Sequence, residues 1–160
     1  MNRVTRVLGI DPGTHRTGFA LLERSGRERP KVLEYGTWEL KAKSSHIESL
    51  LFLHEKIIQF TDKSSPDYAA VEEIFINRNL KTAAKVMQAR GVILMSLAEK
   101  NVNILEPTVT QIKKGITGKG NADKKDIRSA VKLFLGIDLE GHDDSWDAVA
   151  CAFTGFSMIR

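Results

Sequence analysis

The sequence has few of the features that mark a secreted, membrane-spanning or disordered protein. It contains one cysteine, Cys151, so no disulfide can form within the chain, and only 4 prolines occur in 160 residues. No apolar run approaches the roughly 18 residues that a membrane-spanning helix needs, and the N-terminus lacks the basic, apolar and small-residue succession of a signal peptide. These absences predict a cytoplasmic protein with no membrane segment, in which Cys151 is a core thiol.

Charge of one sign is not in great excess, but its distribution along the chain is uneven. Lys and Arg number 24 against 20 Asp and Glu, which leaves a net charge of +4. Between Lys113 and Lys132 the sequence has 7 basic residues and 2 acidic ones. Such a local excess is typical of a surface that holds a polyanion. The length predicts a single domain over residues 1–160.

Apolar periodicity predicts a meander of three strands followed by alternating helices and strands. A capping box at Ser45 and Glu48 marks the start of the first helix. This order implies a mixed sheet with helices on its faces. The expected strands cover residues 5–11, 17–23, 31–40, 67–75 and 103–106. The expected helices cover residues 45–60, 79–100, 108–114, 121–135 and 144–158.

Four carboxylates lie where a strand ends or a helix begins. Asp11 ends the first expected strand, Glu72 is near the end of the fourth, and Asp144 and Asp147 share one face of the last helix. If the first and fourth strands are neighbours, all four acids can converge. Carboxylate oxygens suit Mg²⁺ or Mn²⁺, and two such ions can hydrolyse a phosphodiester. The pattern therefore predicts metal-dependent hydrolysis of nucleic acid.

Each of these acids also has a purely structural interpretation. Asp11 precedes a Pro-Gly pair and can simply open a turn, while Glu72 can be a solvated strand end. Asp144 can be an N-cap. Asp147 is harder to explain in this way, because it lies where the last helix becomes apolar. The joint placement of the four acids favours a site.

Several short motifs occur in a fixed order along nearly the whole chain. They are Leu8-Gly9-Ile10-Asp11-Pro12-Gly13, Thr17-Gly18, Val71-Glu72-Glu73-Ile74-Phe75, Gln88-Ala89-Arg90-Gly91, Gly118-x-Gly120-x-Ala122-x-Lys124 and Asp144-x-x-Asp147-Ala148. In this combination they resemble the RuvC family of Holliday junction resolvases. The resemblance implies an α/β, ribonuclease H-like fold with a five-stranded mixed β-sheet flanked by α-helices. It also implies a homodimer that makes paired symmetric nicks across a four-way DNA junction in recombination and repair.

The resemblance further implies roles for individual residues. Asp11, Glu72, Asp144 and Asp147 would be the catalytic metal ligands for two Mg²⁺ ions per subunit, with Mn²⁺ as a substitute. Phe75 resembles an aromatic that stacks on bases at the crossover, although it can also be a core phenylalanine. The expected DNA-binding residues are Phe75, Arg78, Asn79, Lys81, Lys113, Lys114, Lys119, Lys124 and Lys125. Arg90 can extend this basic track or serve packing.

Three positions depart from the family pattern. Asp126 stands where a polar uncharged residue is expected, and Trp146 stands where a small one is expected. Asp143 adds an acid, so that either Asp143 or Asp144 can be the ligand. His142 is a further candidate neighbour of the site.

The family also implies partners. The helix over residues 79–98 would pack against a second subunit through a stripe that contains Ala83, Ala84, Met87 and Gly91, or it would lie against its own sheet. A branch-migration helicase complex of the RuvA and RuvB type would accompany the enzyme.

Three alternative functions stay open on the sequence alone. One is another ribonuclease H-like nuclease that acts on RNA or other branched DNA. A second is a junction-binding module without activity, against which the presence of all four acids argues. A third is an actin-like or sugar-kinase phosphate loop at residues 10–14, which would need two domains.

Overall fold

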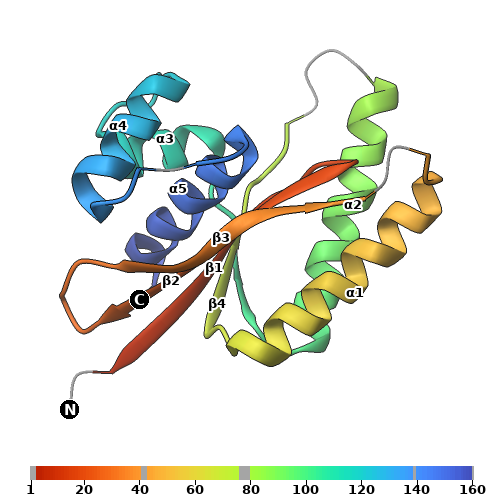
Figure 1. The fold of residues 1–160 in the computed structure, drawn as a ribbon, viewed down its shortest axis with the longest axis horizontal. Helices are drawn as coiled ribbons and strands as arrows, with labels where there is room; N and C mark the ends of the chain where they lie inside the picture. Colours follow the sequence, from red (N-terminus) through yellow and green to blue (C-terminus); the bar gives the residue numbers. More distant parts are fainter. Residues whose placement is uncertain (1–2, 41–42, 76–79, 139, 160) are drawn as a thin grey trace.

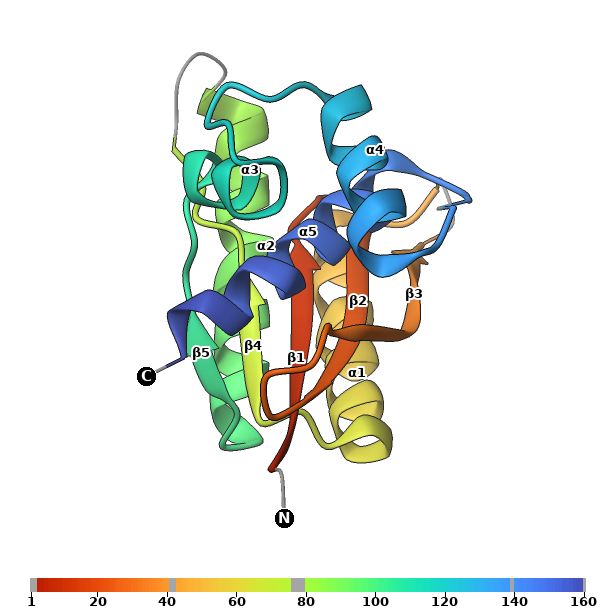
Figure 2. The same cartoon turned by 90° about the vertical axis from the view of Figure 1, so that its left-hand side faces the viewer.

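A mixed five-stranded sheet forms the centre of the structure, a computed structural model that describes residues 3–40, 43–75, 80–138 and 140–159. Its order is β3-β2-β1-β4-β5 (Figure 2), in which β1, β2 and β3 form the predicted antiparallel meander and β4 and β5 run parallel to β1. The strands are β1 (Val4–Asp11), β2 (Arg16–Ser25), β3 (Lys31–Glu39), β4 (Tyr68–Val71) and β5 (Asn103–Leu105).

Helices cover both faces of this sheet, as the element order predicts (Figure 1). One face carries α1 (His46–Ser64) and α2 (Leu80–Glu99), and the other carries α3 (Val109–Thr117), α4 (Lys124–Leu135) and α5 (Asp143–Met158). The predicted capping box of α1 is present, since the Ser45 hydroxyl accepts from the Glu48 N–H while the Glu48 carboxylate accepts from the Ser45 N–H. None of the helices in the described parts of the chain is both long and apolar enough to cross a bilayer.

Several boundaries differ from the sequence prediction for local reasons. The strand expected over residues 67–75 ends at Val71, because the chain then turns toward Pro107, whose carbonyl accepts from the Glu73 N–H. The helix expected from residue 121 begins at Lys124, because the Asp123 side chain caps it. Asp126 completes that capping box by accepting from the Asp123 N–H, which gives this departure from the family pattern a structural role.

The alternation of side chains along β1 separates two hydrophobic cores. Leu8 and Ile10 pack against α1 and α2, whereas Val7 packs on the side of α5. Cys151 of α5 is fully buried there and its thiol donates to the Ala70 carbonyl at 3.2 Å, which confirms it as a core residue.

Two glycines let the backbone of α5 lie directly on the sheet. A Cβ at Gly9 of β1 would overlap the Ala148 carbonyl oxygen and lie 2.6 Å from the Ala152 nitrogen. A Cβ at Gly18 of β2 would overlap the carbonyl of Asp144. Because neither glycine has a side chain, the first turn of α5 lies over the ends of β1 and β2.

We expect Gly9→Ala to lower the free energy of unfolding by about 1–3 kcal/mol, because the added methyl group must displace α5. Urea denaturation of the purified protein measures this change. Gly91→Ala is the matched control, since a Cβ at this exposed helical position meets nothing within 4 Å, and it should gain about 0.5–1 kcal/mol. Equal stability of Gly9→Ala and the unchanged protein would contradict the close approach.

Candidate active site

Asp11 and Glu72 lie next to each other at one end of the sheet. The parallel register pairs Ile10 with Val71, and the Glu72 N–H donates to the Ile10 carbonyl at 3.2 Å. Glu72 follows Val71 directly, so Asp11 and Glu72 are the next residues on the two neighbouring strands. By alternation, both side chains take the face on which α5 lies.

Asp144 and Asp147 approach the same point from α5. Gly18 stands opposite Asp11 in the β1–β2 ladder, and the backbone of Asp144 lies directly over Gly18. The three-residue spacing then directs Asp147 from the same helix face. The structure therefore brings together Asp11, Glu72, Asp144 and Asp147, which we call the carboxylate cluster.

Burial and mutual repulsion change the acidity of this cluster. Burial, and after it the nearby charges of Glu72, Asp147 and Asp144, together raise the pKa of Asp11 to about 8. Burial and the charge of Asp147 together raise the pKa of Glu72 to about 7. The pKa of Asp147 is also raised, mainly by burial. Such perturbed carboxylates, gathered in a cleft, are typical of functional sites.

Two lysines lie beside the acids. Lys113 of α3 and Lys124 of α4 line a cleft of about 310 Å³ together with Glu72 and Asp147. The charge of Lys124 partly offsets the rise in the pKa of Asp11, and the charge of Lys113 does the same for the pKa of Glu72. The cleft therefore offers acidic oxygen donors and cationic groups within the same small volume.

The chemistry of the donor set fits a hard divalent cation. Oxygen ligands from carboxylates are the ones that Mg²⁺ and Mn²⁺ prefer, and coupled carboxylates repel one another unless a cation lies between them. Within the described ranges, no three His, Cys, Asp or Glu side chains are already packed tightly enough to hold an ion. The four carboxylates are thus close enough for their charges to affect one another, but no three of them are packed closely enough to hold one ion as they stand.

Comparison with known proteins gives one consistent answer. Residues 7–155 match the family described as crossover junction endodeoxyribonuclease RuvC. The chain belongs to this family. The protein of that name from Caldicellulosiruptor saccharolyticus is 39% identical over 148 residues, which cover 92% of this chain and 89% of the relative. The one from Syntrophomonas wolfei is 41% identical over 156 residues, with 97% and 90% covered.

A solved structure extends this likeness to the fold. Thermus thermophilus RuvC, in complex with a Holliday junction substrate, has a TM-score of 0.86 and 26% identity, over 94% of this chain and 92% of that one. The fold is therefore ribonuclease H-like, as predicted. As a RuvC-family protein, the chain is assigned to the metal-dependent endonucleases that resolve Holliday junctions.

Within this RuvC-family site, Asp143 and Asp144 have different surroundings. Asp143 pairs with Lys124 at 2.7 Å. The charge of Asp144 raises the pKa of Asp11, whereas the charges of both Asp143 and Asp144 raise that of Asp147. His142 precedes α5 without a capping bond from its side chain, and its charge acts on Glu39. These placements favour Asp144 as the member of the carboxylate cluster.

Arg16 was not predicted as a site residue, but it joins the carboxylate cluster to the sheet. Its Nη1 lies 3.6 Å from the Asp144 carboxylate and its Nη2 lies 3.1 Å from that of Glu39. Arg16 and Glu39 are directly opposite in the β2–β3 ladder. Arg16 directly precedes one expected strand, and Glu39 lies near the end of the next. These opposite charges were the signal in the sequence that could have identified the pair.

The expected DNA-binding residues fall into three groups. Phe75 is 62% exposed, so its interpretation as a core phenylalanine is wrong. Four lysines of the basic segment have exposed side chains and Lys113 is half-buried in the cleft; the exposed ones are Lys114, Lys119, Lys124 and Lys125. Arg78, Asn79 and the side chain of Lys81 lie outside the described residues.

Arg90 does not extend the basic track. It is only 9% exposed, and its Nε donates to the Glu72 carbonyl at 3.0 Å while its Nη2 pairs with the Glu106 carboxylate. A guanidinium that is buried and already bonded to two acceptors of the protein is not available to phosphates. Arg90 therefore serves the interior next to Glu72.

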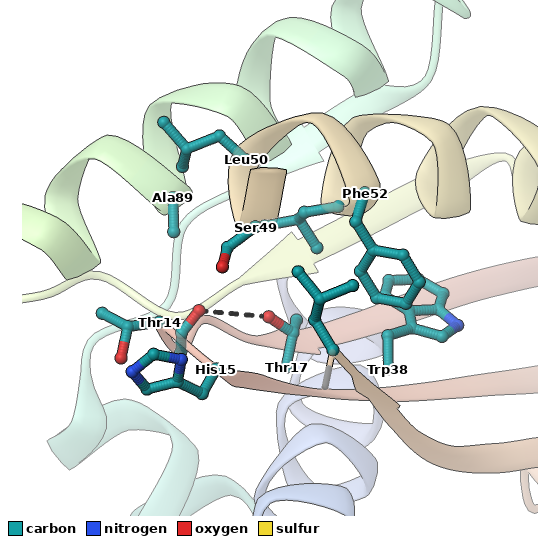
Figure 3. A pocket seen from close by; sticks show the side chains of 11 residues that line it. Thr14, His15, Thr17, Trp38, Ser49, Leu50, Phe52 and Ala89 are labelled. Atoms are coloured by element: carbon teal, nitrogen blue, oxygen red, sulfur yellow. Dashed lines mark hydrogen bonds between the residues drawn. The ribbon is translucent and has the colours of Figure 1, made fainter. Parts of the chain in front are cut away.

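A separate small pocket lies on the other face of the sheet (Figure 3). It has a volume of about 10 Å³ and is lined by residues that include Gly13, Thr14, Trp38 and Ser49. The Thr17 hydroxyl donates to the Gly13 carbonyl across it at 3.3 Å. This volume is about that of a single water, so this pocket does not hold a nucleotide. The match to the RuvC family over residues 7–155 argues against the phosphate-loop interpretation.

The raised pKa values predict that the metal-free protein loses stability as the pH rises. Asp11 and Glu72 hold protons more tightly when folded, so their stabilising effect is complete below about pH 4 and is lost through pH 7 and 8. We expect a loss on the order of 4 kcal/mol between pH 6 and pH 9 with EDTA present. Thermal unfolding across this range measures it.

Asp11→Asn is the control for this measurement, because it removes the more perturbed of the two carboxyl groups. Its stability should fall less steeply over the same pH range than that of the unchanged protein. Identical slopes for the two proteins would show that Asp11 does not titrate in this range.

Proposed function

We propose that this protein resolves Holliday junctions by metal-assisted hydrolysis, with Asp11, Glu72, Asp144 and Asp147 as the ligands of two Mg²⁺ ions per subunit. Mn²⁺ can replace Mg²⁺, since both ions take carboxylate oxygens. The observation that carries the proposal is the electrostatic coupling of the four acids, of which Glu72 and Asp147 line the cleft. Divalent ions relieve this repulsion, and when bound they activate a water and stabilise the leaving oxygen of a phosphodiester.

The residues around the cluster position the DNA strand. The Lys113 and Lys124 side chains line the cleft beside Glu72, where their charges can hold the phosphate that is cleaved. The Arg16 guanidinium orients the Asp144 carboxylate from β2. Lys113 comes from α3, Lys124 from α4 and Arg16 from β2, so cations from three separate elements surround the acids.

Phe75 and the basic segment extend the surface along the junction. Phe75 is exposed and lines a groove of about 520 Å³ together with Glu72, Glu73 and Val109. An aromatic side chain in this position can stack on a base next to the cleaved phosphate, which is worth roughly 1–3 kcal/mol. Lys114, Lys119 and Lys125 would contact the DNA backbone, and Arg78, Asn79 and Lys81 are proposed as further contacts.

The outer faces of α1 and α2 support a homodimer. The buried face of α2 packs on the sheet through Ile93 and Leu97, while Met95 on its other face is 57% exposed. On the neighbouring helix, Ile47 is 72% and Leu51 is 57% exposed. An apolar surface of this kind is typical of a protein interface, and two subunits would supply the two sites that paired nicks require.

Three further parts of the proposal rest on the sequence or on the family, and not on the geometry of the site. The chain would act as one domain over residues 1–160, in the cytoplasm. A branch-migration helicase complex of the RuvA and RuvB type would present the junction to it.

Purified protein should introduce symmetric nicks into a synthetic mobile four-way junction when Mg²⁺ is added. Asp11→Asn should lower kcat on the order of 10³-fold, because it removes a carboxylate from the cluster, and should keep junction affinity without metal. Gel analysis of end-labelled strands measures the nicks. Asp62→Asn is the matched control, because Asp62 pairs with Lys100 away from the cleft.

Two results would contradict this function. One is junction binding without nicks in the unchanged protein, which would favour a binding module. The other is faster cleavage of an RNA–DNA hybrid than of the junction, which would favour a different nuclease of this fold.

Met95→Glu should shift the protein from dimer to monomer, because a charge then lies in the apolar surface of α2. Sedimentation velocity at several concentrations measures the shift, and the nicks in the junction should become unpaired. Leu133→Glu is the matched control, since Leu133 is 72% exposed on α4 of the opposite face. A dimer that persists in Met95→Glu while Leu133→Glu dissociates would place the interface on α4.

A further inference from the structure

Arg90 is the only charged residue that is buried among those the structure describes. It lies on α2, which covers the face of the sheet opposite to α5. A buried guanidinium is costly unless every polar partner is in place. Its partners here are the Glu72 carbonyl and the Glu106 carboxylate, so the guanidinium contacts the main chain of one member of the carboxylate cluster.

The backbone of Glu72 lies at a point where the sheet no longer supports it. The strand β4 ends at Val71, and the Glu72 N–H makes the last bond to β1, donating to the Ile10 carbonyl at 3.2 Å. At the next residue, the Glu73 N–H donates to Pro107 instead. Between these two bonds, the Glu72 carbonyl accepts from Arg90 Nε at 3.0 Å.

Glu106 fixes the other end of the guanidinium. It follows β5 directly and is exposed, so its charge stays solvated while it binds Arg90 Nη2. The planar guanidinium therefore joins α2, the end of β4 and the end of β5 in one arrangement. A planar fork with fixed donor directions can do this, whereas an ammonium cannot.

We propose that Arg90 is a positioning residue for the nuclease reaction, which holds the Glu72 main chain so that the Glu72 carboxylate faces Asp11 and Asp147. The inference rests on the proposed role of Glu72. Arg90 belongs to α2, whose outer face is the proposed dimer surface. Through this one side chain, α2 contacts the main chain of Glu72 in the cluster. Loss of Arg90 leaves the Glu72 carbonyl unbonded at the strand end and frees the carboxylate to move.

Two other roles for Arg90 make different predictions. A residue that only stabilises the fold would lower the temperature of unfolding and leave kcat unchanged wherever the variant is folded. A phosphate contact would weaken junction binding and reduce its salt dependence by about one ion. A positioning residue lowers kcat and metal affinity while junction affinity stays the same.

The test compares Arg90→Met, Arg90→Lys and Glu106→Ala with the unchanged protein. We expect Arg90→Met to lower kcat and Mn²⁺ affinity about 10- to 100-fold, with junction affinity in EDTA changed by less than about threefold. Arg90→Lys should have a smaller loss of kcat and Mn²⁺ affinity than Arg90→Met. The ammonium keeps the positive charge, but it lacks the planar fork that bonds both acceptors. Single-turnover cleavage, Mn²⁺ titration followed by electron paramagnetic resonance, and fluorescence anisotropy measure the three quantities.

Arg6→Met is the matched control. Arg6 lies at the other end of β1 and bonds in the same way, with Nε donating to Glu23 at 2.8 Å and Nη1 donating to the Ser64 carbonyl at 3.1 Å. It should lose stability without any change in kcat or Mn²⁺ affinity. If Arg90→Met fails to fold, Glu106→Ala serves instead, because Glu106 is exposed and its loss frees the guanidinium; kcat should then fall several-fold.

The outcomes separate the two proposals. Unchanged kcat and Mn²⁺ affinity in folded Arg90→Met, or in Glu106→Ala when Arg90→Met does not fold, would overturn the inference and leave the nuclease function intact. A weaker junction complex with a smaller salt dependence would also overturn it, in favour of a phosphate contact. If the unchanged protein made no nicks, the proposed function would fail, and the Mn²⁺ titration would still decide whether Arg90 positions the cluster.

Discussion

The contact on which the site depends is that of the α5 backbone with the glycines of β1 and β2. Because Gly18 has no side chain, the first turn of α5 lies directly on β2, and Gly9 lets the following turns, at Ala148 and Ala152, lie directly on β1. Asp144 and Asp147 therefore reach the ends of these strands. Asp11 and Glu72 are brought beside each other by a parallel pair of strands. The acids are thus positioned by main-chain geometry, which is stiffer than the packing of long side chains.

Local signals in the sequence were sufficient for much of the fold. The meander, the Ser45 capping box and the first turn of α5 each depend on residues within a few positions of one another, and all were predicted correctly. The adjacency of Asp11 and Glu72 depends on pairing between strands about sixty residues apart. From the sequence it could be predicted only on the assumption that these two strands are neighbours. The end of β4 was misplaced because Pro107, distant in sequence, accepts the next hydrogen bond.

The acidic residues of the candidate site could be predicted from the sequence, whereas the roles of its arginines could not. Carboxylates at strand ends form a recognisable pattern, whereas Arg16 and Arg90 act through partners that only the tertiary structure brings near. Both arginines were plain charged residues in a chain with many of them, and burial is what distinguishes Arg90. A charged residue inside a motif can therefore be a surface contact or an interior partner, and its exposure decides between the two.

The raised pKa of Asp11 changes how the site is charged before any ion arrives. With a pKa of about 8, this carboxyl group is mostly protonated at neutral pH. The protonated cluster then has less negative charge than its four acids suggest, and it repels an approaching phosphate less. Under the proposed function, a cation that binds Asp11 would displace this proton, so binding would release acid to the solvent.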